Sequence, residues 1–90
     1  MELTTILARG EDYVFNEVDG ELVMMNIENG SYASMNDTGK SIWGLIEEPK
    51  TVDEVLTSLI VEYDIDRQTA ETEVISFIKK LVKVKVITIS

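Results

Sequence analysis

Two turn-forming dipeptides, Asp19-Gly20 and Asn29-Gly30, constrain the fold of this chain more than any other feature. Asp-Gly and Asn-Gly are the preferred central pairs of type I′ turns, whose twist suits β-hairpins. They separate three short runs with strand character, which are Tyr13–Phe15, Leu22–Ile27 and Ser31–Met35. The sequence therefore predicts a three-stranded antiparallel meander.

The middle run, Leu22–Ile27, is apolar at nearly every position. A strand with one solvated face alternates between apolar and polar residues, so we expect both faces of this strand to be covered. A further short strand is expected near Thr5–Leu7. The segment Val84–Ile89 also has strand character, and it either folds back on the domain or pairs with another chain.

Three helices are predicted after Met35. Asn36 caps the first, Thr51 and Glu54 form a capping box at the second, and Asp66 caps the third. The fold class is α+β, with the N-terminal antiparallel sheet followed by these helices. The predicted helices span about Asp37–Glu47, Thr51–Tyr63 and Arg67–Lys83.

The sequence predicts how two residues of the first helix, Gly39 and Trp43, pack against the rest of the chain. Gly39 costs about 1 kcal/mol relative to alanine inside a helix, which favours a close packing contact at that position. Trp43 lies three residues before Ile46, so both side chains share one face and Trp43 is expected in or near the core.

The composition excludes most catalytic chemistry. The 90 residues leave room for one domain, which we expect to span residues 1–90. The chain has no cysteine and no histidine, and therefore no disulfide, thiolate nucleophile, imidazole base or common zinc site. Glycine-rich phosphate loops and calcium-site patterns are also absent. We expect a protein that is not an enzyme and needs no cofactor or metal.

The net charge of −9 is unevenly distributed. Residues 1–66 hold 15 acidic and 3 basic side chains, whereas residues 67–90 hold 5 basic and 2 acidic ones. An acidic surface repels phosphate, so we expect no nucleic acid as a partner. No apolar run approaches the ~20 residues of a membrane span, and the N-terminus lacks signal-peptide features. We expect a cytoplasmic protein without a membrane partner.

The third predicted helix has an unusually wide apolar sector. Residues at helical spacing form a buried stripe, which consists of Ala70, Val74, Phe77 and Leu81. Ile75, Ile78 and Val82 extend this stripe to about half of the circumference. This extra flank either packs on the C-terminal segment or forms one wall of a groove.

The strand Ser31–Met35 ends the predicted meander and lies at a possible sheet edge. Its unpaired backbone groups are either a liability or a docking site. If the third helix packs beside this edge, an extended peptide can pair with the strand and place alternate side chains in the groove. The alternative is that the N-terminal segment around Ile6 covers the edge.

The stretch from Ser31 to Trp43 resembles the pattern of the PqqD-like family. The matching positions are an aromatic residue, then Met-Asn, a polar pair, Gly and Ile-Trp, and the order continues through Leu45-Ile46, Thr51–Val55 and Tyr63. The resemblance covers about Val14 to Leu81. It implies a winged helix-turn-helix-like RiPP recognition element, which is a module that binds the leader segment of a ribosomally made precursor peptide.

In that family the leader adds to the third strand and lies against the third helix. The strand residues follow from the resemblance, whereas the helix residues are inferred from the wide apolar sector. The predicted peptide-binding residues are Ser31, Tyr32, Ala33, Ser34, Met35, Val74, Ile75, Ile78, Lys79 and Val82.

A stand-alone chain of this size looks most like the chaperone proteins of lasso-peptide biosynthesis. Those proteins present the precursor to a leader-cleaving protease and then to a cyclase. Three alternatives stay open: a PqqD-type adaptor for a radical peptide-modifying enzyme, a winged-helix DNA binder that uses the lysines from Lys79 to Lys85, and a dimerisation module built on the C-terminal segment. A homodimer is therefore also a possible partner state.

Overall fold

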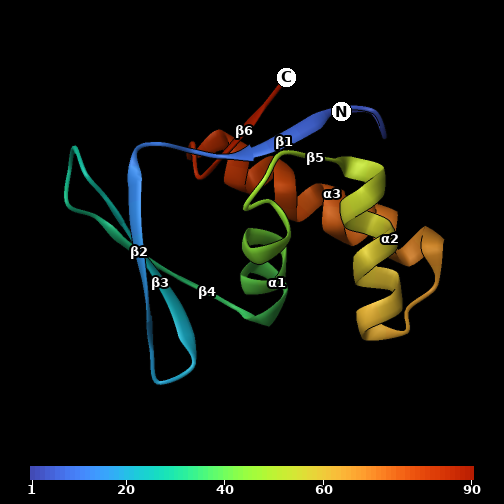
Figure 1. The fold of residues 1–90 in the computed structure, drawn as a ribbon, viewed down its shortest axis with the longest axis horizontal. Helices are drawn as coiled ribbons and strands as arrows, with labels where there is room; N and C mark the ends of the chain where they lie inside the picture. The colour runs from blue at the N-terminus through green and yellow to red at the C-terminus, as the bar shows by residue number, and fades with distance from the viewer.

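The predicted meander is present in the computed structural model, which describes residues 1–90. Strands β2 (Tyr13–Val18), β3 (Glu21–Asn26) and β4 (Tyr32–Met35) pair antiparallel in the order β2-β3-β4 (Figure 1). Asp19 and Gly20 join the first two strands with φ angles of 53° and 82°. Positive φ at both central residues is the conformation of a type I′ turn, as predicted.

The loop between β3 and β4 differs from the prediction. Gly30 has a φ of 72°, but Asn29 does not have a positive φ. The side-chain Oδ1 of Asn26 accepts hydrogen bonds from the backbone N–H groups of Glu28 (2.9 Å) and Asn29 (3.1 Å). The predicted second type I′ turn is therefore wrong, because the Asn26 side chain organises a longer loop of the Asx type.

A second antiparallel sheet brings together three distant segments, in the order β5-β1-β6. Its strands are β1 (Ile6–Arg9), β5 (Lys50–Thr51) and β6 (Ile87–Ile89). β1 confirms the expected strand near the N-terminus. β6 settles the alternative that the sequence left open for the C-terminal segment, which folds back and pairs with β1 of its own chain.

Gly10 lies where the chain leaves this second sheet and enters the meander. Its N–H donates to the carbonyl of Val86 at 2.8 Å. A Cβ at Gly10 would collide with the backbone carbonyl of Lys85. A side chain is therefore excluded here by space, and the junction between the sheets is packed directly against the turn that precedes β6.

The helices are α1 (Asp37–Leu45), α2 (Val52–Tyr63) and α3 (Arg67–Lys83). All three predicted caps form, since Asn36, Thr51 and Asp66 accept side-chain hydrogen bonds from the N–H groups of Gly39, Glu54 and Thr69 at 2.8–3.1 Å. The reciprocal bond from the Thr51 N–H to Glu54 completes the capping box. The predicted α+β fold, an antiparallel meander followed by three helices, is confirmed.

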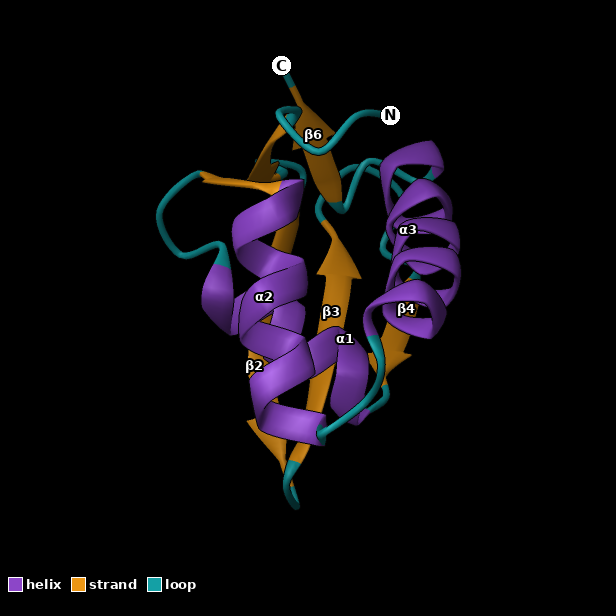
Figure 2. Ribbon diagram, turned by 90° about the vertical axis from the view of Figure 1, so that its right-hand side faces the viewer, coloured by secondary structure: helices purple, strands orange, loops and turns teal.

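The helices cover one face of the meander (Figure 2). On that face Leu22 and Met24 of β3 are buried, whereas Val23 and Met25 on the opposite face are only half-buried. The expectation that both faces of this strand are covered is therefore wrong, because no second layer packs on the outer face. Trp43 is 5% exposed and belongs to the core, as predicted. No helix combines the length and the apolar character that crossing a bilayer requires.

Candidate functional site

The outer side of β4, here named the β4 edge, is free of any strand of this chain. Asn26 donates its N–H to the carbonyl of Ser31 at 2.8 Å, and inward-pointing and outward-pointing backbone groups alternate along an antiparallel strand. The N–H and C=O groups of Tyr32 and Ser34 therefore point away from β3. The N-terminal segment does not cover this edge, since β1 pairs with β5 and β6.

Helix α3 approaches the Met35 end of the β4 edge. A Cβ on Gly39 would lie 3.1 Å from Sδ of Met35 and 3.1 Å from Cζ of Phe77. The predicted close contact at Gly39 is therefore confirmed, and its partners come from β4 and α3. The absence of a side chain at Gly39 lets the end of the strand, the start of α1 and the middle of α3 meet.

A cavity of about 320 Å³ lies at this meeting point. It is mainly apolar and receives side chains from all three helices. Val74, one of the predicted peptide-binding residues, contributes to it although it is only 4% exposed. The lining residues are Asn36, Thr38, Leu59, Tyr63, Ile65, Glu73, Val74 and Phe77.

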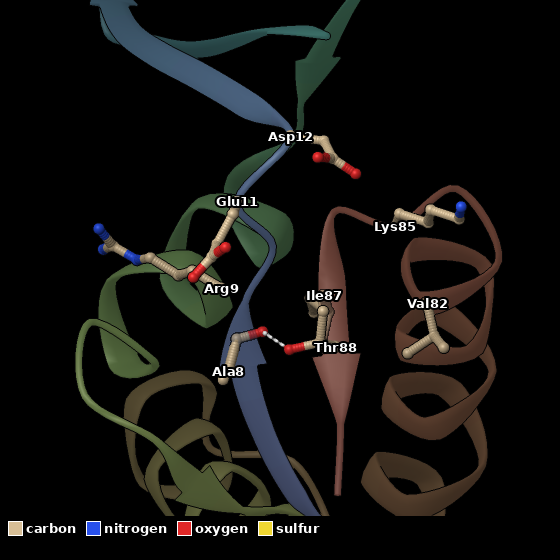
Figure 3. Close-up of a pocket in the computed structure, with 8 residues that line it drawn as sticks. All are labelled: Ala8, Arg9, Glu11, Asp12, Val82, Lys85, Ile87 and Thr88. Atoms are coloured by element: carbon tan, nitrogen blue, oxygen red, sulfur yellow. Dashed lines mark hydrogen bonds between the residues drawn. The ribbon is translucent and has the colours of Figure 1, made fainter. Parts of the chain in front are cut away.

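The other predicted residues of α3 lie elsewhere. Ile78 is fully buried in the core, and Lys79 is exposed. Ile75 and Val82 are half-buried, and at about 100° per residue they lie roughly 140–160° around the helix from Phe77. Val82 faces a different cavity of about 610 Å³, which it shares with residues of β1 and β6 (Figure 3).

Phe77 is not among the predicted peptide-binding residues, because its helical spacing assigns it to the buried stripe. The structure leaves it half-buried beside Met35. Glu73, Lys80 and Val84 follow the same flank at spacings of three and four residues. Gly39 is the one position in the sequence that indicates this contact, because a glycine inside a helix favours a close packing partner.

A separate cluster joins the two sheets at the other edge of the meander, next to β2 and on the face that the helices cover. Arg9 donates from Nε (3.0 Å) and Nη2 (2.7 Å) to the carbonyl of Trp43. Its guanidinium lies 4.5 Å from the Trp43 ring centroid and 5.1 Å from that of Phe15. Lys40 and Glu17 form an ion pair of 3.1 Å nearby.

The pKa shifts belong to helix ends and surface pairs. Hydrogen bonds from the Thr51 and Thr69 backbone N–H groups lower the pKa of Glu54 and of Asp66, respectively. A hydrogen bond to Asp53 raises the pKa of Arg67. No group of three or more His, Cys, Asp or Glu residues is arranged to hold a metal ion. The β4 edge and the neighbouring cavity offer unpaired backbone groups and mainly apolar side chains.

Comparison with known proteins identifies related chains. The family model described as "Coenzyme PQQ synthesis protein D (PqqD)" matches residues 21–87. A solved structure described as "TbiB1 in Complex with the TbiA(beta) Leader Peptide" is similar, with a TM-score of 0.80 and 28% sequence identity. The match covers 89% of this chain and 93% of that chain. A search of curated proteins finds no match.

Proposed function

Because the chain belongs to the PqqD family, we propose that it binds the leader segment of a ribosomally synthesised precursor peptide as a strand added to the β4 edge. The protein then presents this precursor to modifying enzymes and performs no chemistry itself. The observation that carries the proposal is the open β4 edge with α3 beside it. In this proposal residues 1–90 act as one leader-binding domain.

The backbone of β4 supplies the register of the added strand. Tyr32 and Ser34 carry the outward N–H and C=O groups, so the leader pairs with these two residues. The flanking Ser31, Ala33 and Met35 hold β4 on β3 and support the edge. Main-chain pairing of this kind gives affinity that depends little on sequence, while alternate side chains give specificity.

The helix wall supplies the side-chain preference. Phe77 lies beside Met35, and its flank continues to Glu73 on one side and to Lys80 and Val84 on the other. Among the residues predicted from the apolar sector, Val74 lies at the cavity below this wall. Ile75, Ile78, Lys79 and Val82 have a supporting role in this proposal, because they face the core, solvent or the β6 side of α3.

The likeness to a chain that was solved with a leader peptide supports a leader as the ligand. Together with the sequence resemblance to lasso-peptide chaperones, it favours a leader-cleaving protease and a cyclase as the enzymes served in the cytoplasm. The family description favours the second candidate, an adaptor for a radical peptide-modifying enzyme. The net charge of −9 disfavours the DNA-binding alternative.

The test uses synthetic leader peptides taken from any small open reading frame that is found next to the gene. We expect addition of such a peptide to ¹⁵N-labelled protein to shift the amides of Tyr32, Ser34 and Phe77. Ser34→Pro removes one outward N–H without breaking the pairing of β4 with β3, so it should weaken binding at least tenfold. Glu17→Pro is the matched control, because Glu17 has an outward N–H on the opposite edge of the same sheet.

Equal loss of binding in Ser34→Pro and Glu17→Pro, with both proteins folded by circular dichroism, would contradict the β4 edge as the site. Saturable shifts confined to Val82 and β6 would instead assign the peptide to the other side of α3. Turnover of the peptide by the purified protein would contradict the adaptor role.

A further inference from the structure

The meander has a second open edge, on β2. Ile27 donates its N–H to the carbonyl of Asp12 at 2.8 Å, so the alternating residues Val14 and Asn16 direct their backbone groups to β3. The N–H and C=O groups of Phe15 and Glu17 consequently point outward, and they make no hydrogen bond within the chain. We name this outer side of Tyr13–Val18 the β2 edge.

This edge has little of the usual protection against pairing, since Glu17 is its one charged residue. Its six residues contain no proline, lysine or bulge, and Val14, Phe15 and Val18 are 47%, 50% and 50% exposed. Natural proteins shorten, charge or cover such edges, because an exposed apolar edge strand recruits another strand. The β2 edge is also longer than the four-residue β4 strand.

We propose that the β2 edge pairs with the β2 edge of a second copy of this chain, antiparallel about a two-fold axis through Asn16. Both partners must direct outward backbone groups at each other, so Phe15 of one copy pairs with Glu17 of the other. On the outer face of the sheet this register sets Val14 opposite Val18 of the second copy. Apolar cross-strand pairs of this kind stabilise a sheet.

Charge complementarity selects this register. The Arg9 guanidinium lies over the Phe15 ring, 5.1 Å from its centroid, and its bonds to the Trp43 carbonyl leave other N–H groups free. Glu17 of the second copy, which already pairs with Lys40 of its own chain, lies opposite Phe15 and therefore comes next to a second, preorganised cation. The two-fold axis produces this ion pair twice.

Neighbouring registers lose this pairing. A shift of two residues in one direction sets Glu17 opposite Glu17, which places like charges across the strands. A shift in the other direction sets Glu17 opposite Tyr13 and Val14 opposite Asn16, so both the ion pair and the valine pairs are lost. Shifts of one residue point the backbone donors and acceptors away from each other.

Pairing through β2 leaves the proposed function intact. It produces a continuous six-stranded sheet whose two outer edges are the β4 edges, so a dimer binds two leader peptides independently. Each copy carries a net charge of −9, so the two copies repel each other over long range. Screening of this repulsion strengthens the association as ionic strength rises.

The absence of native cysteine makes disulfide cross-linking a clean test of register. In Asn16→Cys the two Cα atoms form a non-hydrogen-bonded pair at about 4.5 Å, within disulfide range. In Val14→Cys and Val18→Cys the identical residues lie four positions apart along the strands, about 13 Å, and cannot be bridged. We expect a covalent dimer on mild oxidation of Asn16→Cys alone.

Sedimentation of variants without cysteine is the second test, and it measures the dimer dissociation constant. Glu17→Pro removes an outward N–H from the β2 edge and should raise the dimer dissociation constant at least tenfold, whereas Ser34→Pro should leave it unchanged. Equal cross-linking of all three cysteine variants, a monomer at every concentration and salt, or a dimer insensitive to Glu17→Pro would each overturn the proposal. Leader titration of Glu17→Pro reports separately on the β4 edge, so failure of one site is distinguishable from failure of the other.

Discussion

The two sheets of this protein have the same number of strands and opposite roles. In the β5-β1-β6 sheet, Leu7 and Ile87 are buried, and reciprocal backbone bonds of 3.0 Å join Ile6 to Ser90. In the meander, Leu22 and Met24 are buried, while β2 and most of β4 are exposed. The first sheet uses its pairing to hold distant segments on the core, and the second projects unpaired edges into solvent.

This difference indicates that the β5-β1-β6 sheet mainly stabilises the fold, whereas the meander provides the edges that are proposed to pair with other strands. A strand that contributes buried side chains resists change, because its removal leaves a cavity. A strand that contributes backbone groups tolerates side-chain change, because its neighbours need only its hydrogen bonds. The following substitutions test whether the separation is as sharp as the structure indicates.

The largest effect is expected for Trp43→Ala, because Trp43 contacts both sheets. Its ring meets Phe15 of β2 edge to face, with centroids 5.3 Å apart, and lies 4.5 Å from the guanidinium of Arg9 of β1. Loss of a buried tryptophan should lower the free energy of unfolding by about 3–5 kcal/mol. Chemical denaturation measures this change, and a near-neutral result would mean that the Trp43 ring does not join the two sheets.

Leu7→Ala and Val14→Ala compare the sheets directly. Leu7 is fully buried in β1, and its truncation should cost about 2–5 kcal/mol. Val14 is 47% exposed on β2, and its truncation should change the stability of the monomer by no more than about 0.5 kcal/mol. Equal losses in dilute protein would show that the meander carries as much stability as the second sheet.

Arg9→Met tests the link between the sheets with less disruption. Methionine keeps part of the apolar stem but removes both hydrogen bonds to the Trp43 carbonyl and the stacking on two rings. We expect a loss of about 1–2 kcal/mol in unfolding free energy, with leader binding retained. A larger loss of unfolding free energy than that of Leu7→Ala would show that this contact contributes more to stability than the buried side chain of β1.

The smallest expected effect is on pH dependence. Hydrogen bonds from backbone N–H groups lower the pKa of Glu54 and Asp66 in the folded state, below reference values of 4.5 and 3.8. Their stabilising contribution is therefore present above those values and is lost as the pH falls through the lowered folded pKa.

Asp66→Asn keeps a capping oxygen that does not titrate in this range. Melting temperatures measured from pH 6 downward should therefore fall less steeply for Asp66→Asn than for the native chain once the pH is below about 4. Parallel curves would show that the α3 cap does not contribute to acid sensitivity. Both caps are on helices, so leader binding should follow the folded fraction alone.

Local chemistry explains which parts of the fold were predictable. Asp19-Gly20 and the caps at Asn36, Thr51 and Asp66 act over a few residues, and the helices they start were located closely. The sheet formed by β5, β1 and β6 depends on pairing between distant segments. β5 has only two residues, Lys50–Thr51, and no pattern in so short a run distinguishes a strand from a loop.

The candidate site was predictable in its strand and not in its helix. The order of elements places β4 last in the meander, so an edge was expected, but only the pairing of β1 with β5 and β6 shows that the segment around Ile6 does not cover it. The apolar sector of α3 indicates how much of the helix is covered, but it does not indicate which flank meets which strand. Phe77 faces β4 and Val82 faces β6, and only the packing of α3 distinguishes these two positions.

The close packing at Gly10 has a mechanical consequence. A glycine between two sheets is commonly a point of flexibility, but here the backbone of Lys85 and Val86 occupies the space around it and binds its N–H. The meander is therefore expected to move with α3 as one rigid body instead of swinging about a hinge. A peptide held on β4 would leave the protein in a fixed direction, which residual dipolar couplings can measure.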